Sequence, residues 1–86
     1  MKNFKLYAYR EEIDLINFIE KFETLEQATQ YININSDEEY EGCELVLHNK
    51  IKDETFILFD YWEELELSVK NHFKKLFNKI YGGNHV

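Results

Sequence analysis

The chain is short and acidic: its 86 residues include 17 acids and ten lysines and arginines, for a formal net charge of −7. This length supports one core and excludes mechanisms that need two domains, so we expect residues 1–86 to form a single domain. A negatively charged surface repels phosphate, which disfavours direct nucleic-acid binding and favours a protein partner with a basic surface.

Cysteine usage and the amino terminus predict a cytoplasmic protein. Cys43 is the only cysteine, and the first ten residues, MKNFKLYAYR, lack the apolar core of a secretory signal. No stretch reaches the roughly 18 apolar residues that a membrane-spanning helix needs. The chain also lacks proline, and its composition is associated with AT-rich bacterial or phage genomes, an association that carries no physical argument.

The first third of the chain predicts two strands and a helix. Residues 3–9 alternate apolar and polar or tyrosine side chains, which is the period of a strand with one buried face. The apolar run at 15–22 fits a strand or a helix by periodicity alone. Thr24 and Gln27 have the spacing of a capping box, so a helix over 25–33 begins there and the run before it is assigned as a strand.

The middle of the chain predicts an acidic loop followed by a hairpin. Residues 33–42 are polar and rich in carboxylates, which indicates a loop. Residues 43–48 and 55–59 are rich in residues that favour strands and are separated by a longer turn. Both faces of this hairpin carry apolar side chains, so periodicity does not decide which face is covered.

Residues 60–81 predict one long amphipathic helix. Asp60 is a good N-cap, Glu63 suits a capping box, and Gly82 and Gly83 favour termination. The tail at 84–86 is expected to fray. At about 100° per residue, one stripe collects the side chains predicted to be buried, namely Trp62, Leu65, Val69, Phe73, Leu76 and Ile80.

These elements predict an α+β domain in the order ββαββα. We expect a mainly antiparallel sheet with its helices against one face, the long C-terminal helix among them. Strand order does not follow from the sequence.

Charge is distributed unevenly along the chain. Residues 1–66 contain all 17 acids and six bases, whereas residues 67–86 contain four lysines and no acid. The acids are densest in the middle loop, so we predict a partner-binding surface there. Its residues are Asp37, Glu38, Glu39, Tyr40, Glu41 and Glu44.

No pattern predicts catalysis, a metal or a cofactor. His48, His72, His85 and Cys43 show none of the spacings of metal sites. Carboxylates are abundant, but those in a turn or at a helix start are explained by solvation or capping. We therefore predict no catalytic residue, no metal ligand, no cofactor and no enzymatic activity.

Three functional hypotheses remain. The first is a protein-binding module, resembling inhibitors or immunity proteins in role, encoded by a phage or mobile element; in a sharper form its acids imitate DNA phosphates and block a defence enzyme. The second is a structural homo-oligomer such as a homodimer, since aromatics make up 16% of the chain. The third is a small enzyme or ligand binder with a pocket between sheet and helix, using Tyr7, Tyr9 or His72.

Overall fold

Five antiparallel strands form one sheet in the order β2-β1-β3-β4-β5. The computed structural model describes residues 2–34, 42–49, 51–59 and 61–82. The elements in chain order are β1 (Phe4–Arg10), β2 (Leu15–Phe22), α1 (Leu25–Ile34), β3 (Glu44–Asn49), β4 (Glu54–Leu58), β5 (Trp62–Glu64) and α2 (Leu67–Phe77), with a 3-10 turn at Glu11–Ile13 and a π-helical turn at Asn78–Gly82. The α+β class predicted from the sequence is confirmed.

Local sequence accounts for the first three elements. The β1–β2 connection closes at Asp14, which adopts φ of 51° and donates its N–H to the Glu11 carbonyl at 3.1 Å. The predicted capping box is present, because the Gln27 N–H donates to Thr24 Oγ1 at 3.1 Å. The Gln27 side chain reaches one residue further back than expected and accepts the Glu23 N–H at 2.9 Å. These contacts satisfy backbone donors that a helix start leaves open.

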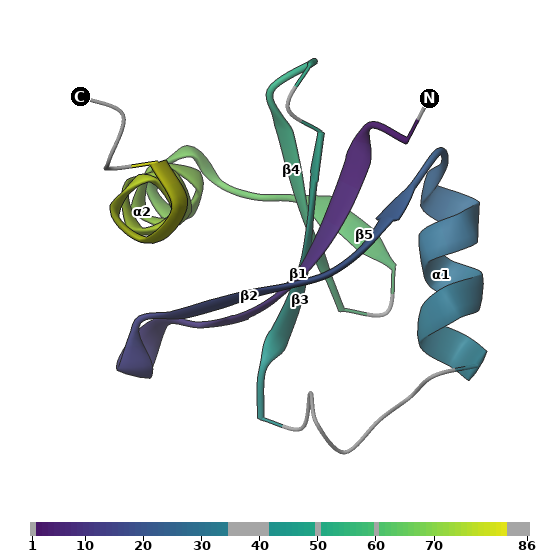
Figure 1. Cartoon of the computed structure of the whole chain (residues 1–86), viewed down its shortest axis with the longest axis horizontal. Coiled ribbons are helices and arrows are strands. Elements are labelled where there is room, and N and C mark those ends of the chain that lie inside the picture. The colour runs from purple at the N-terminus through teal and green to yellow at the C-terminus, as the bar shows by residue number, and fades with distance from the viewer. Residues whose placement is uncertain (1, 35–41, 50, 60, 83–86) are drawn as a thin grey trace.

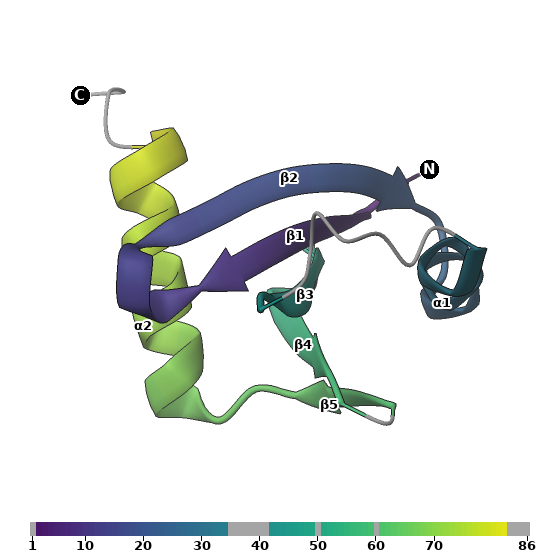
Figure 2. The ribbon, with the colours of Figure 1, turned by 90° about the horizontal axis from the view of Figure 1, so that it is seen from below.

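The sheet is covered on both faces. Figure 1 shows α2 and α1 on opposite sides of the strands, and Figure 2 shows the same separation after a quarter turn. The core beneath α2 contains Tyr7, Tyr9, Ile16, Val46, Ile57, Phe73 and Leu76. The core beneath α1 contains Leu6, Phe22, Ala28 and Leu47, with Phe56 and Trp62 packed against it. The expectation of helices on one face is therefore wrong. Side chains on both faces of β1 are buried, because Tyr7 and Tyr9 occupy the face that the alternation in the sequence marked as partly polar.

An irregularity in β2 makes this arrangement possible. Leu6 pairs with Glu20 and Tyr7 with Phe18, so Ile19 is an extra residue opposite β1. If β2 paired regularly along its whole length, alternation would place Phe22 and Ile16, six residues apart, on the same face of the sheet. With the extra residue, Phe22 joins the core beneath α1 and Ile16 joins the core beneath α2.

The predicted helix at 60–81 begins later than expected, so the order ββαββα lacks one strand. Trp62, Glu63 and Glu64 form β5, pairing with Leu58, Ile57 and Phe56 of β4. The Leu65 N–H then donates to the Thr55 carbonyl at 3.0 Å, and α2 starts after Glu66. Asp60 lies outside the described residues. Tertiary packing overrides the helix preference of this glutamate-rich segment.

Trp62 explains why the segment forms a strand. Its indole N–H donates to Thr29 Oγ1 of α1 at 2.9 Å, so the ring packs on the face opposite α2. Within the predicted stripe, Phe73 and Leu76 are buried as expected, whereas Ile80 is 44% exposed. The π-helical turn at Asn78–Gly82 changes the phase of the helix at that point.

Replacing Phe73 tests the packing of α2. Phe73 is 1% exposed, so Phe73→Ala should lower the free energy of unfolding by about 3–5 kcal/mol, measured by urea denaturation. Phe59→Ala is the control, since Phe59 is 62% exposed and its loss should change stability by less than about 0.5 kcal/mol. Equal effects of the two changes would contradict this packing.

A double-mutant cycle tests the position of β5. Trp62→Phe and Thr29→Val each remove one partner of the bond to α1. Their effects on the free energy of unfolding should be coupled by about 0.5–1.5 kcal/mol, the net value of a hydrogen bond. If residues 60–81 instead formed one helix, Trp62 would lie between that helix and the sheet and would not reach Thr29, so the two effects would be additive. Additive effects would therefore refute the strand assignment.

Candidate functional site

Strand register sorts the side chains on the α2 face of the sheet into three rows. Directly paired residues share a face, so each row can be read across the strands. The first row is Lys21, Lys5, His48 and Thr55; the second is Phe18, Tyr7, Val46, Ile57 and Glu63; the third is Ile16, Tyr9 and Glu44. The first row contains two lysines and a histidine, whereas the second row ends at Glu63 and the third at Glu44.

Helix α2 separates the two charged margins. Phe73 places its ring edge to face against Tyr7 and Tyr9, with centroids 6.1 Å and 5.4 Å away. It therefore covers the middle of the sheet and leaves a hollow on either flank. We call these the aromatic cleft, on the side of Lys5 and His48, and the acidic groove, on the side of Glu44.

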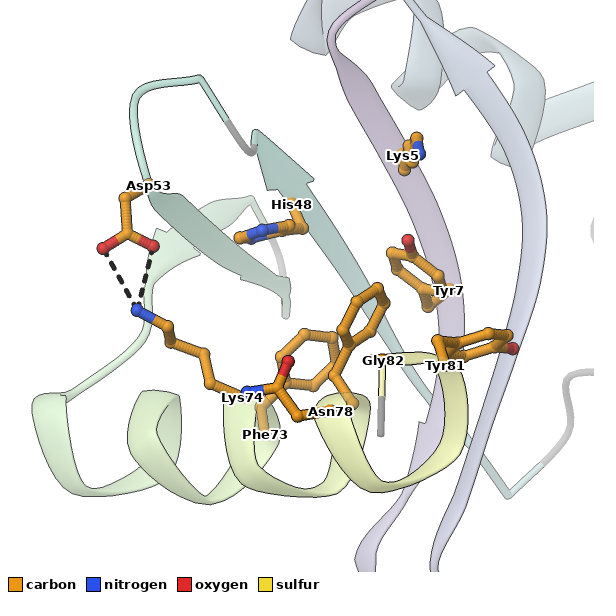
Figure 3. A pocket seen from close by; sticks show the side chains of 10 residues that line it. Lys5, Tyr7, His48, Asp53, Phe73, Lys74, Asn78, Tyr81 and Gly82 are labelled. Carbon is orange, nitrogen blue, oxygen red and sulfur yellow. Dashed lines mark hydrogen bonds and ion pairs between the residues drawn. The ribbon is translucent and has the colours of Figure 1, made fainter. Parts of the chain in front are cut away.

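The aromatic cleft has a volume of about 420 Å³ and is lined by rings from the sheet and from α2. Figure 3 shows His48 and Tyr7 on the sheet side, with Phe73 and Tyr81 approaching from the helix and its terminal turn. Phe77 lies 5.4 Å from Tyr7 in an edge-to-face contact and 5.0 Å from Tyr81. The Tyr81 hydroxyl donates to the Ile16 carbonyl of β2 at 2.7 Å, which fixes this side of the cleft.

Polar groups surround the other end of the aromatic cleft. Lys74 Nζ donates to both carboxylate oxygens of Asp53, at 3.1 and 3.2 Å, as Figure 3 shows. Lys70 Nζ donates to the Asp53 carbonyl at 2.6 Å. The Lys74 hydrogen bond, with the nearby charges of Lys70 and Lys74, lowers the pKa of Asp53. Asp53 therefore stays ionised and ties the β3–β4 turn to α2.

Two other ionisable groups of the cleft are held neutral. Burial lowers the pKa of His48, even though the Asp53 charge acts in the opposite direction. His48 Nδ1 lies 3.0 Å from Thr55 Oγ1, which orients the imidazole. Burial also raises the pKa of Tyr7 to about 12, with a smaller contribution from Tyr81. At neutral pH the Tyr7 hydroxyl remains a hydrogen-bond donor.

The acidic groove, about 370 Å³ in volume, has an apolar floor and a rim of carboxylates. Ile57, Leu65 and Val69 contribute to the floor, and the exposed Phe59 lies at its edge. The rim consists of Glu11, Glu44, Glu63, Glu64 and Glu66. These glutamates come from the 3-10 turn, β3, β5 and the residue that caps α2. Five acids from three separate stretches of the chain thus share one opening.

Tyr9 adds an unpartnered hydrogen-bonding group beneath this opening. The side chain is 1% exposed and lines the acidic groove, and its hydroxyl has no hydrogen-bond partner among the described residues. Burial, followed by the charges of Glu11, Glu44 and Asp14, raises its pKa to about 12. A buried hydroxyl without a partner is costly unless a ligand or water completes it.

The residues predicted from sequence for partner binding are only partly placed. Asp37, Glu38, Glu39, Tyr40 and Glu41 lie outside the described residues. Glu44 is exposed at the start of β3 and belongs to the acidic groove. Sequence reasoning missed its neighbours there because Glu63, Glu64 and Glu66 were assigned to a helix start, where capping explained them.

The side chains predicted to line a ligand pocket, Tyr7, Tyr9 and His72, lie in three different places. Tyr7 lines the aromatic cleft and Tyr9 the acidic groove. His72 is exposed on α2, with Nε2 3.7 Å from Glu11 Oε1, and lines neither hollow. His48, which sequence reasoning weighed only as a metal ligand, lines the aromatic cleft.

Metal sites and membrane-spanning helices are both absent from the part of the chain that the structure describes. Across residues 2–34, 42–49, 51–59 and 61–82, no three metal-ligating side chains gather closely enough to hold an ion. No helix within those ranges has the length and apolar character needed to span a membrane.

Comparison of the chain with protein-family models, curated proteins and solved structures gives no match. Function is therefore inferred from the geometry of the two hollows.

The lowered pKa of His48 predicts a pH dependence of stability. The unfolded chain, with a histidine pKa near 6.5, binds the proton more tightly than the folded protein does. Stability should therefore fall as the pH drops below about 7, by at most about 1.4 kcal/mol per pH unit for one proton, and this loss should level off below the folded pKa.

Urea denaturation between pH 7 and pH 5 measures this slope. His48→Gln should flatten it, whereas His72→Gln, the same change at an exposed histidine of α2, should preserve the His48 contribution. An unchanged slope in His48→Gln would mean that the imidazole is not held neutral by the fold.

Proposed function

We propose that this protein is a non-enzymatic binding module whose acidic groove receives a basic segment of another protein. The observation that carries the proposal is the convergence of five glutamates around an apolar floor with an unpartnered buried hydroxyl beneath it. A segment that pairs lysine or arginine with an apolar side chain complements both parts of the groove. We further propose that the protein acts in the cytoplasm.

The charged rim and the apolar floor have different roles in such a contact. Long-range attraction between the acids and a basic partner raises the association rate and is weakened by salt. Affinity comes from apolar side chains that become desolvated. Phe59, which lines the groove, is 62% exposed. Tyr61 and Leu67, which are close in the chain to the lining residues Glu63 and Glu66, are 66% and 71% exposed, so apolar area is available beside the rim.

Tyr9 supplies selectivity. With its pKa raised to about 12, the hydroxyl is protonated at neutral pH and is a donor. Because the hydroxyl is enclosed in the unbound protein, only a segment that opens the groove around it and offers a backbone carbonyl or a side-chain oxygen gains a buried hydrogen bond with it.

An inhibitor or immunity role, with a phage or mobile-element origin, is the specific form of this function that we favour. Capture of a basic protein from a bacterial lysate, followed by identification, tests that form. A stricter alternative is that the acids imitate DNA phosphates and thereby block a nucleic-acid-binding enzyme. In that case duplex DNA should release the captured protein in competition, whereas a partner held by the apolar floor should resist release.

A structural homodimer is a second candidate, favoured by one observation. β2 is an edge strand of eight residues, and Phe18 on it and Ile13 just before it are 44% and 59% exposed. An open strand edge with apolar neighbours suits pairing with a second copy. Light scattering at micromolar concentration decides this alternative, because a strict monomer removes it.

The groove is tested with a charge-matched pair of variants. The probe is a fluorescent peptide in which arginine and leucine alternate, and the measurement is fluorescence anisotropy at two salt concentrations. Replacing Glu44, Glu63 and Glu66 by Gln should weaken binding at least about tenfold, equivalent to about 1.4 kcal/mol, because all three belong to the rim.

The control changes net charge equally but elsewhere. Glu12, Glu20 and Glu26 are exposed and lie outside the acidic groove, so replacing them by Gln should weaken binding by less than about threefold. Equal losses in the two triple variants would show that the peptide responds to net charge alone, and the groove proposal would fail.

A further inference from the structure

We propose that the aromatic cleft is a separate binding site for a small planar aromatic anion. The ring of the ligand packs against Phe77 and Tyr81, which cover the buried ring of Tyr7, and its negative group lies against Lys5. The class includes aromatic phosphates and aromatic carboxylates, which share this chemistry. The proposal does not rest on the acidic groove, because the two hollows have no lining residue in common.

Size and shape support a small ligand. The volume of about 420 Å³ falls in the range of roughly 300–1000 Å³ that is typical of small-molecule sites. The rings around it present both faces and edges: Phe73 and Phe77 are 29° from parallel, whereas Phe77 and Tyr7 meet at 84°. Phe77 is half-buried and Tyr81 is 44% exposed, so these two rings leave surface on which one further planar ring can pack.

The charge of the cleft differs in sign from that of the whole protein. Lys5 and Lys74 line it, and Lys70 contacts the same Asp53 as Lys74 does. Asp53 is the single acid of the lining and is held by Lys74. The lining thus contains one more lysine than acid, a net charge of +1, although the chain as a whole carries −7.

Lys5 is the cation available to a ligand. It is half-buried and makes no ion pair with a described residue. Its direct partner across the strands is Lys21, and like charges in that position destabilise a sheet. Lys21 lines a smaller hollow with Lys5, Tyr7, Phe77 and Tyr81 that continues the cleft. A bound anion would relieve this repulsion.

The C-terminal end of α2 continues into an irregular turn that contributes residues to the aromatic cleft. The π-helical turn at Asn78–Gly82 places Tyr81 so that its hydroxyl reaches the Ile16 carbonyl. Asn78 and Gly82 line the cleft at this turn. π-Helical turns occur often at functional sites, and this one contributes an amide side chain beside the rings.

Titration of the isotope-labelled 86-residue chain with four probes, followed by amide chemical shifts, tests the proposal. Adenosine monophosphate and indole-3-acetate carry both a ring and a negative group, one as phosphate and one as carboxylate. Adenosine lacks the charge and inorganic phosphate lacks the ring. At least one of the first two should produce saturable shifts around Lys5, His48 and Phe77, at least tenfold tighter than either of the incomplete probes.

The two complete probes also identify the anion. Tighter binding of adenosine monophosphate assigns the site to a phosphate, and tighter binding of indole-3-acetate assigns it to a carboxylate. The proposal is overturned if neither complete probe saturates below about 5 mM, which corresponds to roughly −3 kcal/mol. It is equally overturned if adenosine or inorganic phosphate binds as tightly as the complete probes.

Matched lysine variants localise the binding. Lys5→Gln should weaken the complete probe at least tenfold, and Phe77→Leu should weaken it through the ring contacts. Lys75→Gln is the control, because Lys75 is an exposed lysine of α2 outside the cleft. It should change affinity by less than twofold.

Lys5→Gln decides the question if Phe77→Leu fails to fold, because Lys5 is not a member of either core cluster. The variant in which Glu44, Glu63 and Glu66 are replaced by Gln should still bind the aromatic anion. The two proposals can therefore fail independently. A negative binding result for the acidic groove does not affect the proposal for the aromatic cleft, and a negative result for the cleft does not affect the proposal for the groove.

Discussion

The contact on which the rest of the structure depends is the packing of Phe73 against Tyr7 and Tyr9. These two tyrosines alternate with Leu6 and Ala8 in β1, so one strand supplies both cores of the molecule. Phe73 holds α2 across the centre of one face, and the opposite face carries α1. Neither hollow would exist without that contact, because the sheet supplies one wall of each and α2 supplies the other.

Much of the local structure could be predicted from the sequence, because short-range chemistry determines it. The strand at 15–22 and the helix at 25–33 match β2 and α1, since Thr24 and Gln27 mark the boundary between them. The hairpin at 43–48 and 55–59 corresponds within a residue to β3 and β4. Propensity and capping act within a few residues and are visible in a sequence.

The remaining features depend on partners distant in the chain. β5 forms because Trp62 reaches Thr29, 33 residues earlier, and periodicity carries no information about such a bond. The covering of both faces depends on tyrosines whose rings are buried although their hydroxyls made them read as polar. The acidic groove follows from these two facts, because β5 is what brings Glu63 beside Ile57.

The extra residue in β2 has a consequence for the outer edge of the sheet. A version of β2 without Ile19 would pair regularly with β1 and keep every side chain on its present face. It would also present an unbroken row of free backbone donors and acceptors to other chains, which is the template on which aggregates grow. The bulge interrupts that row, so a regular strand cannot pair along the whole of β2, and a second copy that pairs there has to accommodate the extra residue.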